Sequence, residues 1–367
     1  MFKMLSRIAA AFFLAMIIFL ANTSALANSG LDFQLEQNKH VMLHLENGDL
    51  LCSVLNEERS IEAIELLSDR DEFIWNTKLP EPLGMPIIPL AKKDSTGFIV
   101  SGKNRVSALF QIYEINAEGE IDLTVSLPVG SFPLALTEQG CLYTITDKEG
   151  KQALVFENWQ NEMLAQSEFD GKIQYSQYSM YDDRRIFYDT SYKDQSDQIK
   201  VGIGCFDLQK GLLWHFEVGN AENWNIQSIC LNNIGGVTMI SQYARDNLDV
   251  YQTITVLDDN GIVHSQHEIK SSYYNPVAQI IQQSPDKNYR IWGSAGICNE
   301  GETYPYTDTT YALTLSSQGE YLSEECGKYV GTCVLYNGDI YVYNVDGNNY
   351  INICKFEPLK KNSKNFF

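Results

Sequence analysis

The chain has 367 residues, with 27 Lys and Arg against 47 Asp and Glu, and a formal net charge of −20 at pH 7. This acidic balance argues against a nucleic-acid partner, because phosphates are neutralised by Lys and Arg. The length allows two ordinary domains or one large repeat domain. No Pro- or Ser-rich linker divides the chain, so we expect one domain.

The N-terminal segment has the features of a signal peptide, and we assign residues 1–27 to it and residues 28–367 to the mature domain. Lys3 and Arg7 precede an apolar run from Ile8 to Ala21, and Ala25-Leu26-Ala27 offers small residues for cleavage. The apolar run is shorter than the roughly 20 residues of a bilayer span. We therefore expect a secreted or extracytoplasmic protein with no membrane span after cleavage. The alternative is a retained leader that anchors the protein at the cell surface.

A hairpin pattern recurs along the rest of the chain. An apolar or aromatic run meets a tight turn that contains Gly or Asn, and a second run follows. The clearest turns contain Gly119, Gly211, Gly261 and Gly319, and weaker copies lie at residues 69–71 and at Asn161. Gly and Asn supply the positive φ that such turns need. A regular period of about 40 to 50 residues, with two further strand-like runs between hairpins, is typical of a β-propeller.

The pattern predicts an all-β fold, a seven-bladed β-propeller of four-stranded antiparallel blades. The expected blades span residues 39–79, 85–127, 131–169, 172–218, 224–269, 274–324 and 328–357. The seventh supplies only three strands, so we expect the strand at residues 31–35 to add its outer strand and close the ring. The alternative is an irregular pair of β-domains.

One blade carries a family resemblance. The run from Asp207 to Glu217, which includes Gly211 followed by Leu212-Leu213-Trp214, resembles the repeat of quinoprotein-type (pyrroloquinoline-quinone-like) propellers. The other hairpins lack the Trp, and WD-repeat propellers are a looser match because no Gly-His or Trp-Asp pairs recur. The resemblance implies the propeller fold. It does not carry over the quinone, and we expect no cofactor, since fold analogy does not place a ligand site.

The sequence surroundings of most cysteines indicate a role in core packing and not in metal binding. Five of the eight lie inside apolar strand-like runs, where a thiol behaves as a small core residue: Cys52, Cys141, Cys205, Cys230 and Cys354. Cys326 and Cys333 are the closest pair in sequence and the best candidates for a disulfide. No CxxC motif and no Cys/His cluster with zinc spacing is present.

Signatures of metal sites and catalysis are also missing. His40 and His44 are expected to share one face of a strand, but two His residues alone do not make a metal site. Acidic turns such as residues 257–261 and 344–349 lack EF-hand spacing, and tight turns favour Asp, Asn and Gly for backbone reasons. We therefore predict no metal ligands and no catalytic residues.

The loops offer a better clue to function. In a propeller, the connections between blades and the turns between second and third strands emerge on one face, here called the loop face. The expected loop face is rich in aromatic and Arg residues, which are enriched in recognition surfaces. The ligand-binding residues predicted there are Trp224, Tyr273, Tyr274, Tyr304, Tyr306, Tyr192, Tyr243, Arg245 and Arg105.

These features favour an exported binding or scaffold protein that recognises an extracellular protein, peptide or glycan through the loop face. The alternative is an extracellular enzyme that acts on a polysaccharide or small molecule at the mouth of the propeller channel. Such an enzyme needs a cluster of carboxylates, His or Arg at that mouth. A third reading gives the tyrosines, of which the chain has 21, a packing role over the blade edges.

Overall fold

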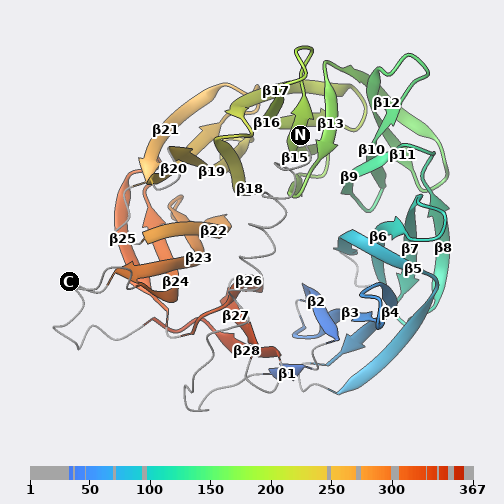
Figure 1. The fold of residues 1–367 in the computed structure, drawn as a ribbon, viewed down its shortest axis with the longest axis horizontal. Helices are drawn as coiled ribbons and strands as arrows, with labels where there is room; N and C mark the ends of the chain where they lie inside the picture. The colour runs from blue at the N-terminus through green and yellow to red at the C-terminus, as the bar shows by residue number, and fades with distance from the viewer. Residues whose placement is uncertain are drawn as a thin grey trace.

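The computed structural model describes residues 33–35, 38–45, 47–68, 72–92, 97–245, 249–269, 274–298, 306–327, 329–336, 339–345 and 351–358. In these ranges every regular element is a β-strand, and the antiparallel sheets are arranged around a common axis (Figure 1). The predicted leader lies outside the described residues. The all-β propeller expected from the repeat is confirmed.

Each blade is a meander whose first strand lies nearest the axis. Blade 1 contains β2 (Lys39–His44), β3 (Leu50–Leu55), β4 (Ile61–Leu67) and the first part of β5 (Phe73–Ala91). Blade 2 contains the second part of β5, β6 (Gly97–Asn104), β7 (Phe110–Asn116) and β8 (Ile121–Ser126). Blade 3 contains β9 (Phe132–Leu136), β10 (Gly140–Thr146), β11 (Gln152–Asn158) and β12 (Met163–Phe169).

The remaining blades follow the same order. Blade 4 contains β13 (Lys172–Tyr175), β14 (Ser179–Tyr181), β15 (Arg185–Lys193), β16 (Ile199–Asp207) and β17 (Gly211–Asn220). Blade 5 contains β18 (Trp224–Leu231), β19 (Val237–Arg245), β20 (Asp249–Leu257) and β21 (Val263–Ile269). Blade 6 contains β22 (Tyr274–Gln283), β23 (Tyr289–Cys298), β24 (Tyr306–Leu315) and β25 (Tyr321–Cys326). Blade 7 contains β26 (Thr332–Tyr336), β27 (Asp339–Val345), β28 (Ile351–Lys355) and β1 (Phe33–Leu35).

Three blades depart from the expected four separate strands. β5 is one continuous strand that pairs with β4 through its first part and with β6 through its second, so blades 1 and 2 form a single sheet. The pairing of Ile61 with Leu83 carries the ladder across residues 80–84, where the sequence predicted a break. In blade 4 the inner strand is divided into β13 and β14, which both pair with β15.

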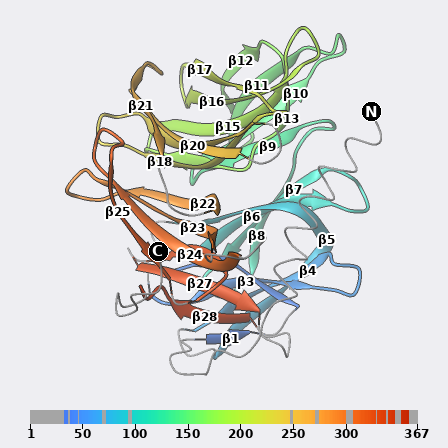
Figure 2. The ribbon, with the colours of Figure 1, turned by 60° about the vertical axis from the view of Figure 1, so that its left-hand side comes forward.

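The N-terminal strand β1 is the outer strand of the last sheet. Phe33, Gln34 and Leu35 pair antiparallel with Ile353, Asn352 and Ile351 of β28, and Figure 2 shows β1 beside β28. Leu35 and Ile353 then pack with Leu50 and Cys52 of blade 1. This contact joins the last blade to the first and leaves β28 with a partner on each side.

Apolar clusters fill the spaces between neighbouring blades. The described residues form seven such clusters, and each draws side chains from one pair of neighbours, including the pair of blades 7 and 1. The five cysteines predicted to be core residues are all buried. Burial between sheets therefore stabilises the ring, as the apolar strand patterns require.

The turns follow the predicted chemistry. Gly119, Gly211, Gly261 and Gly319 have φ between 76° and 90°, and Asn161 has φ of 62°. In the turn of Gly261, Asp258 Oδ1 accepts the amide N–H groups of residues 260 and 262, both at 2.9 Å. These carboxylates satisfy turn amides, the ordinary structural role of Asp and Asn at such positions.

In two blades, a tryptophan side chain of the outer strand packs on a turn of the next blade. Trp214 in β17 lies against Gly261 of blade 5 and donates its indole N–H to Asp259 O at 3.0 Å. Trp75 in β5 does the same at the turn of Gly119, where its N–H donates to Ala117 O at 2.9 Å. The run from Asp207 to Glu217, which resembles the quinoprotein-type repeat, thus contains a residue that joins two blades. The equivalent role of Trp75 was not predicted from the sequence, because the turn before Trp75 contains no Gly.

Candidate functional site

The described residues of the predicted site lie at one edge of their blades. Trp224 begins inner strand β18 and pairs with Tyr243 near the end of β19. In blade 6, Tyr274 begins β22 and Tyr306 begins β24, and both pair with the end of β23. Inner strands begin, second strands end and third strands begin at this edge, so these positions belong to the loop face. Tyr273 and Tyr304 lie outside the described residues.

Blade 5 carries a row of three aromatic side chains at this edge. Trp224, Tyr243 and Tyr251 are directly opposite one another on β18, β19 and β20, so their side chains lie on the same face of the sheet. The rings of Trp224 and Tyr243 are 4.9 Å apart between centroids and tilted by 49°. Trp224 and Tyr243 are half-buried, and Tyr251 is 36% exposed. We call these three residues the aromatic row.

The two predicted arginines do not lie together. Arg245 is at the end of β19, and its Cα is paired with Asp249 beside the aromatic row. Arg105 is exposed in the turn after β6, and its side chain lies along Gly84 of blade 2. Blades 2 and 5 lie on opposite sides of the ring (Figure 1). The structure therefore places the aromatic row and Arg105 on one face, far apart around it.

Tyr192 does not join the exposed surface. It is only 6% exposed and packs edge-on against Phe169 and His215, with centroid distances of 5.5 and 4.9 Å. Its hydroxyl donates to Glu217 Oε2 at 3.2 Å. Along β15, alternate residues Tyr188, Thr190 and Tyr192 are all buried. Its place near a strand end predicted exposure, whereas the alternation of β15 directs its ring between blades 3 and 4.

A buried carboxylate interrupts the inner strand of blade 4. Asp189 on β15 is 7% exposed, and its Oδ1 accepts hydrogen bonds from Ser176 Oγ at 3.0 Å and from the amides of Gln177 and Tyr178 at 2.7 Å. Burial raises the pKa of Asp189 to about 6, although these donors act in the opposite direction. The carboxylate replaces the strand ladder between β13 and β14.

The buried carboxylate of Asp189 could have been found from a repeated sequence position, although it was not predicted. The second strands of blades 1, 2, 3 and 5 hold a buried hydroxyl residue at the position that Asp189 occupies: Ser53, Ser101, Thr144 and Ser241. Blade 4 therefore differs from these four blades, because it has a carboxylate where they have a hydroxyl group. The run Gln174-Tyr175-Ser176-Gln177 beside it also lacks the apolar alternation of a buried strand.

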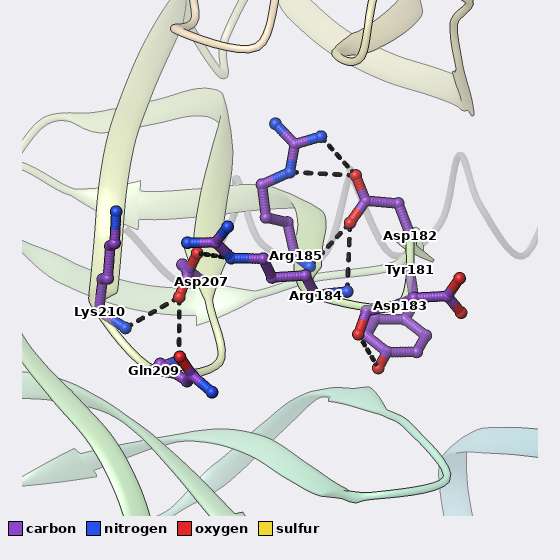
Figure 3. Close-up of polar contacts among 8 residues, drawn as sticks. All are labelled: Tyr181, Asp182, Asp183, Arg184, Arg185, Asp207, Gln209 and Lys210. Atoms are coloured by element: carbon purple, nitrogen blue, oxygen red, sulfur yellow. Dashed lines mark hydrogen bonds and ion pairs between the residues drawn. The ribbon is translucent and has the colours of Figure 1, made fainter.

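A second polar cluster joins two turns of blade 4 at the opposite edge (Figure 3). Arg184 donates from Nε to Asp207 Oδ2 at 2.7 Å, and Arg185 donates from Nη2 to Asp182 Oδ2 at 2.6 Å. Burial opposes ionisation of Asp207, but the amides of Gln209 and Lys210 and the charge of Arg184 outweigh it and lower the pKa of this carboxyl. Both arginines are ion-paired, so this cluster holds the turns together.

The described residues contain no group of three or more His, Cys, Asp or Glu residues that could hold a metal ion. A bulge between Val41 and Leu43 shifts the register of β2, so that the backbone of His40 pairs with Ser53 and that of His44 with Leu50. The side chain of His44 lies outside the described residues, so the expectation that the two His residues share a face stays a prediction.

The proposed disulfide is also wrong. Cys326 and Cys333 are thiols and are not bonded to each other. Cys333 is buried between blades 6 and 7, and its Sγ lies 3.8 Å from Gly293 O. Proximity in sequence therefore did not bring the two sulfur atoms into bonding geometry.

The sheets and their order define the class of the protein, a β-propeller. Similar solved structures include a chain of hydrazine synthase from Kuenenia stuttgartiensis, with a TM-score of 0.53 at 9% identity over 90% of this chain and 99% of that one. The β-propeller domain of the Trilobed protease from Pyrococcus furiosus has a TM-score of 0.50 at 8% identity, again over 90% and 99%. Extracellular domains 1–2 of Drosophila Semaphorin 1a have a TM-score of 0.50 at 7% identity, over 90% and 88%.

At these identities the likeness concerns the fold alone. No family model matches the chain, and no curated protein matches it. Among the described residues, no helix is long and apolar enough to cross a membrane.

Proposed function

We propose that this chain is an exported β-propeller that binds an extracellular protein, peptide or glycan through the loop face. The observation that carries the proposal is the aromatic row of Trp224, Tyr243 and Tyr251. Aromatic side chains supply large contact areas at low entropic cost, and they dominate the energetics of many interfaces. The signal-peptide pattern expected at residues 1–27 supports export.

The hydrogen bonds of the tryptophans support the choice of Trp224. Trp75, Trp159 and Trp214 each donate their indole N–H to a backbone carbonyl, at 2.9 to 3.0 Å. Within the described ranges, no hydrogen bond engages the indole of Trp224. Its Cδ1–Nε1 edge lies against Gly219 and its ring is tilted by 49° to that of Tyr243, so among these four tryptophans it is the one whose N–H has no described carbonyl partner.

The test is an array of glycans and cell-surface proteins, probed with the mature protein and with Trp224→Ala. Binding of any array ligand should fall at least tenfold in Trp224→Ala. The matched control is Tyr321→Ala, which removes a 47% exposed ring from outer strand β25. Equal binding by Trp224→Ala and the unmodified protein would refute the assignment of the loop face. Mass spectrometry of the secreted protein tests export separately, with Asn28 as the expected first residue.

A further inference from the structure

We propose that the inner strand of blade 4 carries a binding site for a neutral oligosaccharide, formed by Gln174, Tyr175 and Gln177 and held in position by Asp189. This site lies on the inner wall of the propeller and is distinct from the aromatic row on the loop face.

The first step is the shape of the backbone. In blades 1, 3, 5 and 6 the inner strand passes its neighbour with only local register shifts. In blade 4, residues 176–178 leave the ladder, and the carboxylate of Asp189 holds them through three hydrogen bonds. The same segment is tied back where the amide of Asp189 donates to Tyr178 O at 3.0 Å. The segment is thus fixed in a shape that a continuous strand does not adopt.

The second step is the direction of the side chains. Ile173 and Ser176 are buried, and Tyr178 packs against the core between blades 4 and 5. Gln174, Tyr175 and Gln177 are exposed, with Tyr175 at 43%. β13 is the first strand in the order of its sheet, and it lies on the inner side of the ring (Figure 1). The division of the strand therefore presents one ring and two amides from the inner edge of the blade.

The third step is the chemistry that these groups recognise. Residues 173–181 contain no charged side chain, in a chain with a net charge of −20. Primary amides both donate and accept, which matches the hydroxyl groups of a sugar, and a tyrosine ring offers an apolar face to the sugar C–H groups. Residues 173–181 offer neither an exposed cation nor an exposed carboxylate, and Lys172 at the start of β13 is the exposed charge next to them in the chain. A neutral, hydroxyl-rich ligand is the complementary class.

The fourth step is the cost of the arrangement. A buried carboxylate is expensive, and the equivalent positions of blades 1, 2, 3 and 5 use Ser or Thr. A departure from the repeat that costs stability is expected where the structure serves function. Asp189 is a positioning residue in this proposal, because its carboxylate reaches the segment and not the ligand.

The experiment titrates the mature protein with cellohexaose, maltohexaose and chitohexaose by isothermal calorimetry, with oligogalacturonate as a charged comparison. At least one neutral hexasaccharide should bind, and Tyr175→Ala and Gln177→Ala should each raise its Kd at least tenfold without changing Tm. Tyr321→Ala, which removes a similarly exposed ring, should leave Kd within twofold. Asp189→Asn keeps the Oδ1 acceptor and should bind within threefold of the unmodified protein, whereas Asp189→Ala should lose binding.

Several results would overturn the proposal. These are a lack of binding by all three neutral sugars, binding of the charged oligosaccharide alone, or a Kd unchanged by Tyr175→Ala. Binding lost in Trp224→Ala but retained in Tyr175→Ala would refute this inference and leave the loop-face proposal standing. The reverse pattern would do the opposite. The exposed variants decide the outcome even if Asp189→Ala fails to fold.

Discussion

The contact between Trp214 and Gly261 gives a direct measure of how neighbouring blades are joined. A Cβ added at Gly261 would lie 2.6 Å from Cδ2 of the Trp214 ring, closer than real Cβ contacts allow. Gly261 also has φ of 76°, where L-residues are disfavoured. Gly150 is the matched control. Its turn has the same capping pattern, with Asp147 Oδ1 accepting two amides, its φ is 86°, and a Cβ there meets nothing within 4 Å.

The stability losses of Gly261→Ala and Gly150→Ala should therefore differ only by the contact of Gly261 with Trp214. Gly150→Ala should cost about 1 kcal/mol, the penalty of positive φ. Gly261→Ala carries that penalty and also forces the indole to move, for which overpacking typically costs about 2 kcal/mol. Moving the ring also weakens the hydrogen bond from its N–H to Asp259 O, at about 1 kcal/mol. We expect Gly261→Ala to lose about 4 kcal/mol.

Urea denaturation followed by circular dichroism measures both losses. In the background of Trp214→Ala, the added cost of Gly261→Ala should fall to that of Gly150→Ala, because the clashing ring is gone. If Gly261→Ala and Gly150→Ala cost the same in the unmodified protein, the indole does not pack tightly on this turn and the proposed lock between blades 4 and 5 is refuted.

Three further predictions concern Asp189, Gln152 and two of the cysteines. Because the pKa of Asp189 is raised from 3.8 to about 6, the folded chain keeps a proton that the unfolded chain releases, so stability should fall by about 2 kcal/mol between pH 4 and 6. Asp189→Asn should lack this fall in urea titrations across that range, and an equal slope would contradict the assignment. Gln152 bonds both backbone groups of Ile173 across blades 3 and 4, so Gln152→Ala should lower the free energy of unfolding by about 3 kcal/mol, and a loss under 1 kcal/mol would argue against this bridge. Peptide mapping without reductant should yield no fragment that links Cys326 to Cys333, and finding one would contradict the structure.

The propeller could be predicted because its signals are local and repeat. Gly119, Gly211, Gly261 and Gly319 mark turns that require positive φ, and all four adopt it. Period-two apolar patterns then place the strands between them. A three-stranded last blade led to the prediction that residues 31–35 add its outer strand, and residues 33–35 pair with β28. Each of these statements depends on a few neighbouring residues or on regular spacing.

The orientation of individual side chains could not be predicted in the same way. A single bulge in β2 shifts which residues of β3 oppose His40 and His44, and the alternation of β15 directs Tyr192 into the core. Both outcomes depend on the register with a neighbouring strand or on the blade beyond it. A residue's place at a strand end therefore predicted the correct edge of the blade but not the correct face of the sheet.

The sequence by itself determined the repeat, the turns, the apolar strands and the closing strand, because hairpin chemistry acts over a few residues. Only the tertiary structure decided that Trp224, Tyr243 and Tyr251 form a row, and that Asp189 reaches across to residues 176–178. Those contacts join strands whose register is set by bulges and by packing between blades, and no local pattern encodes that register.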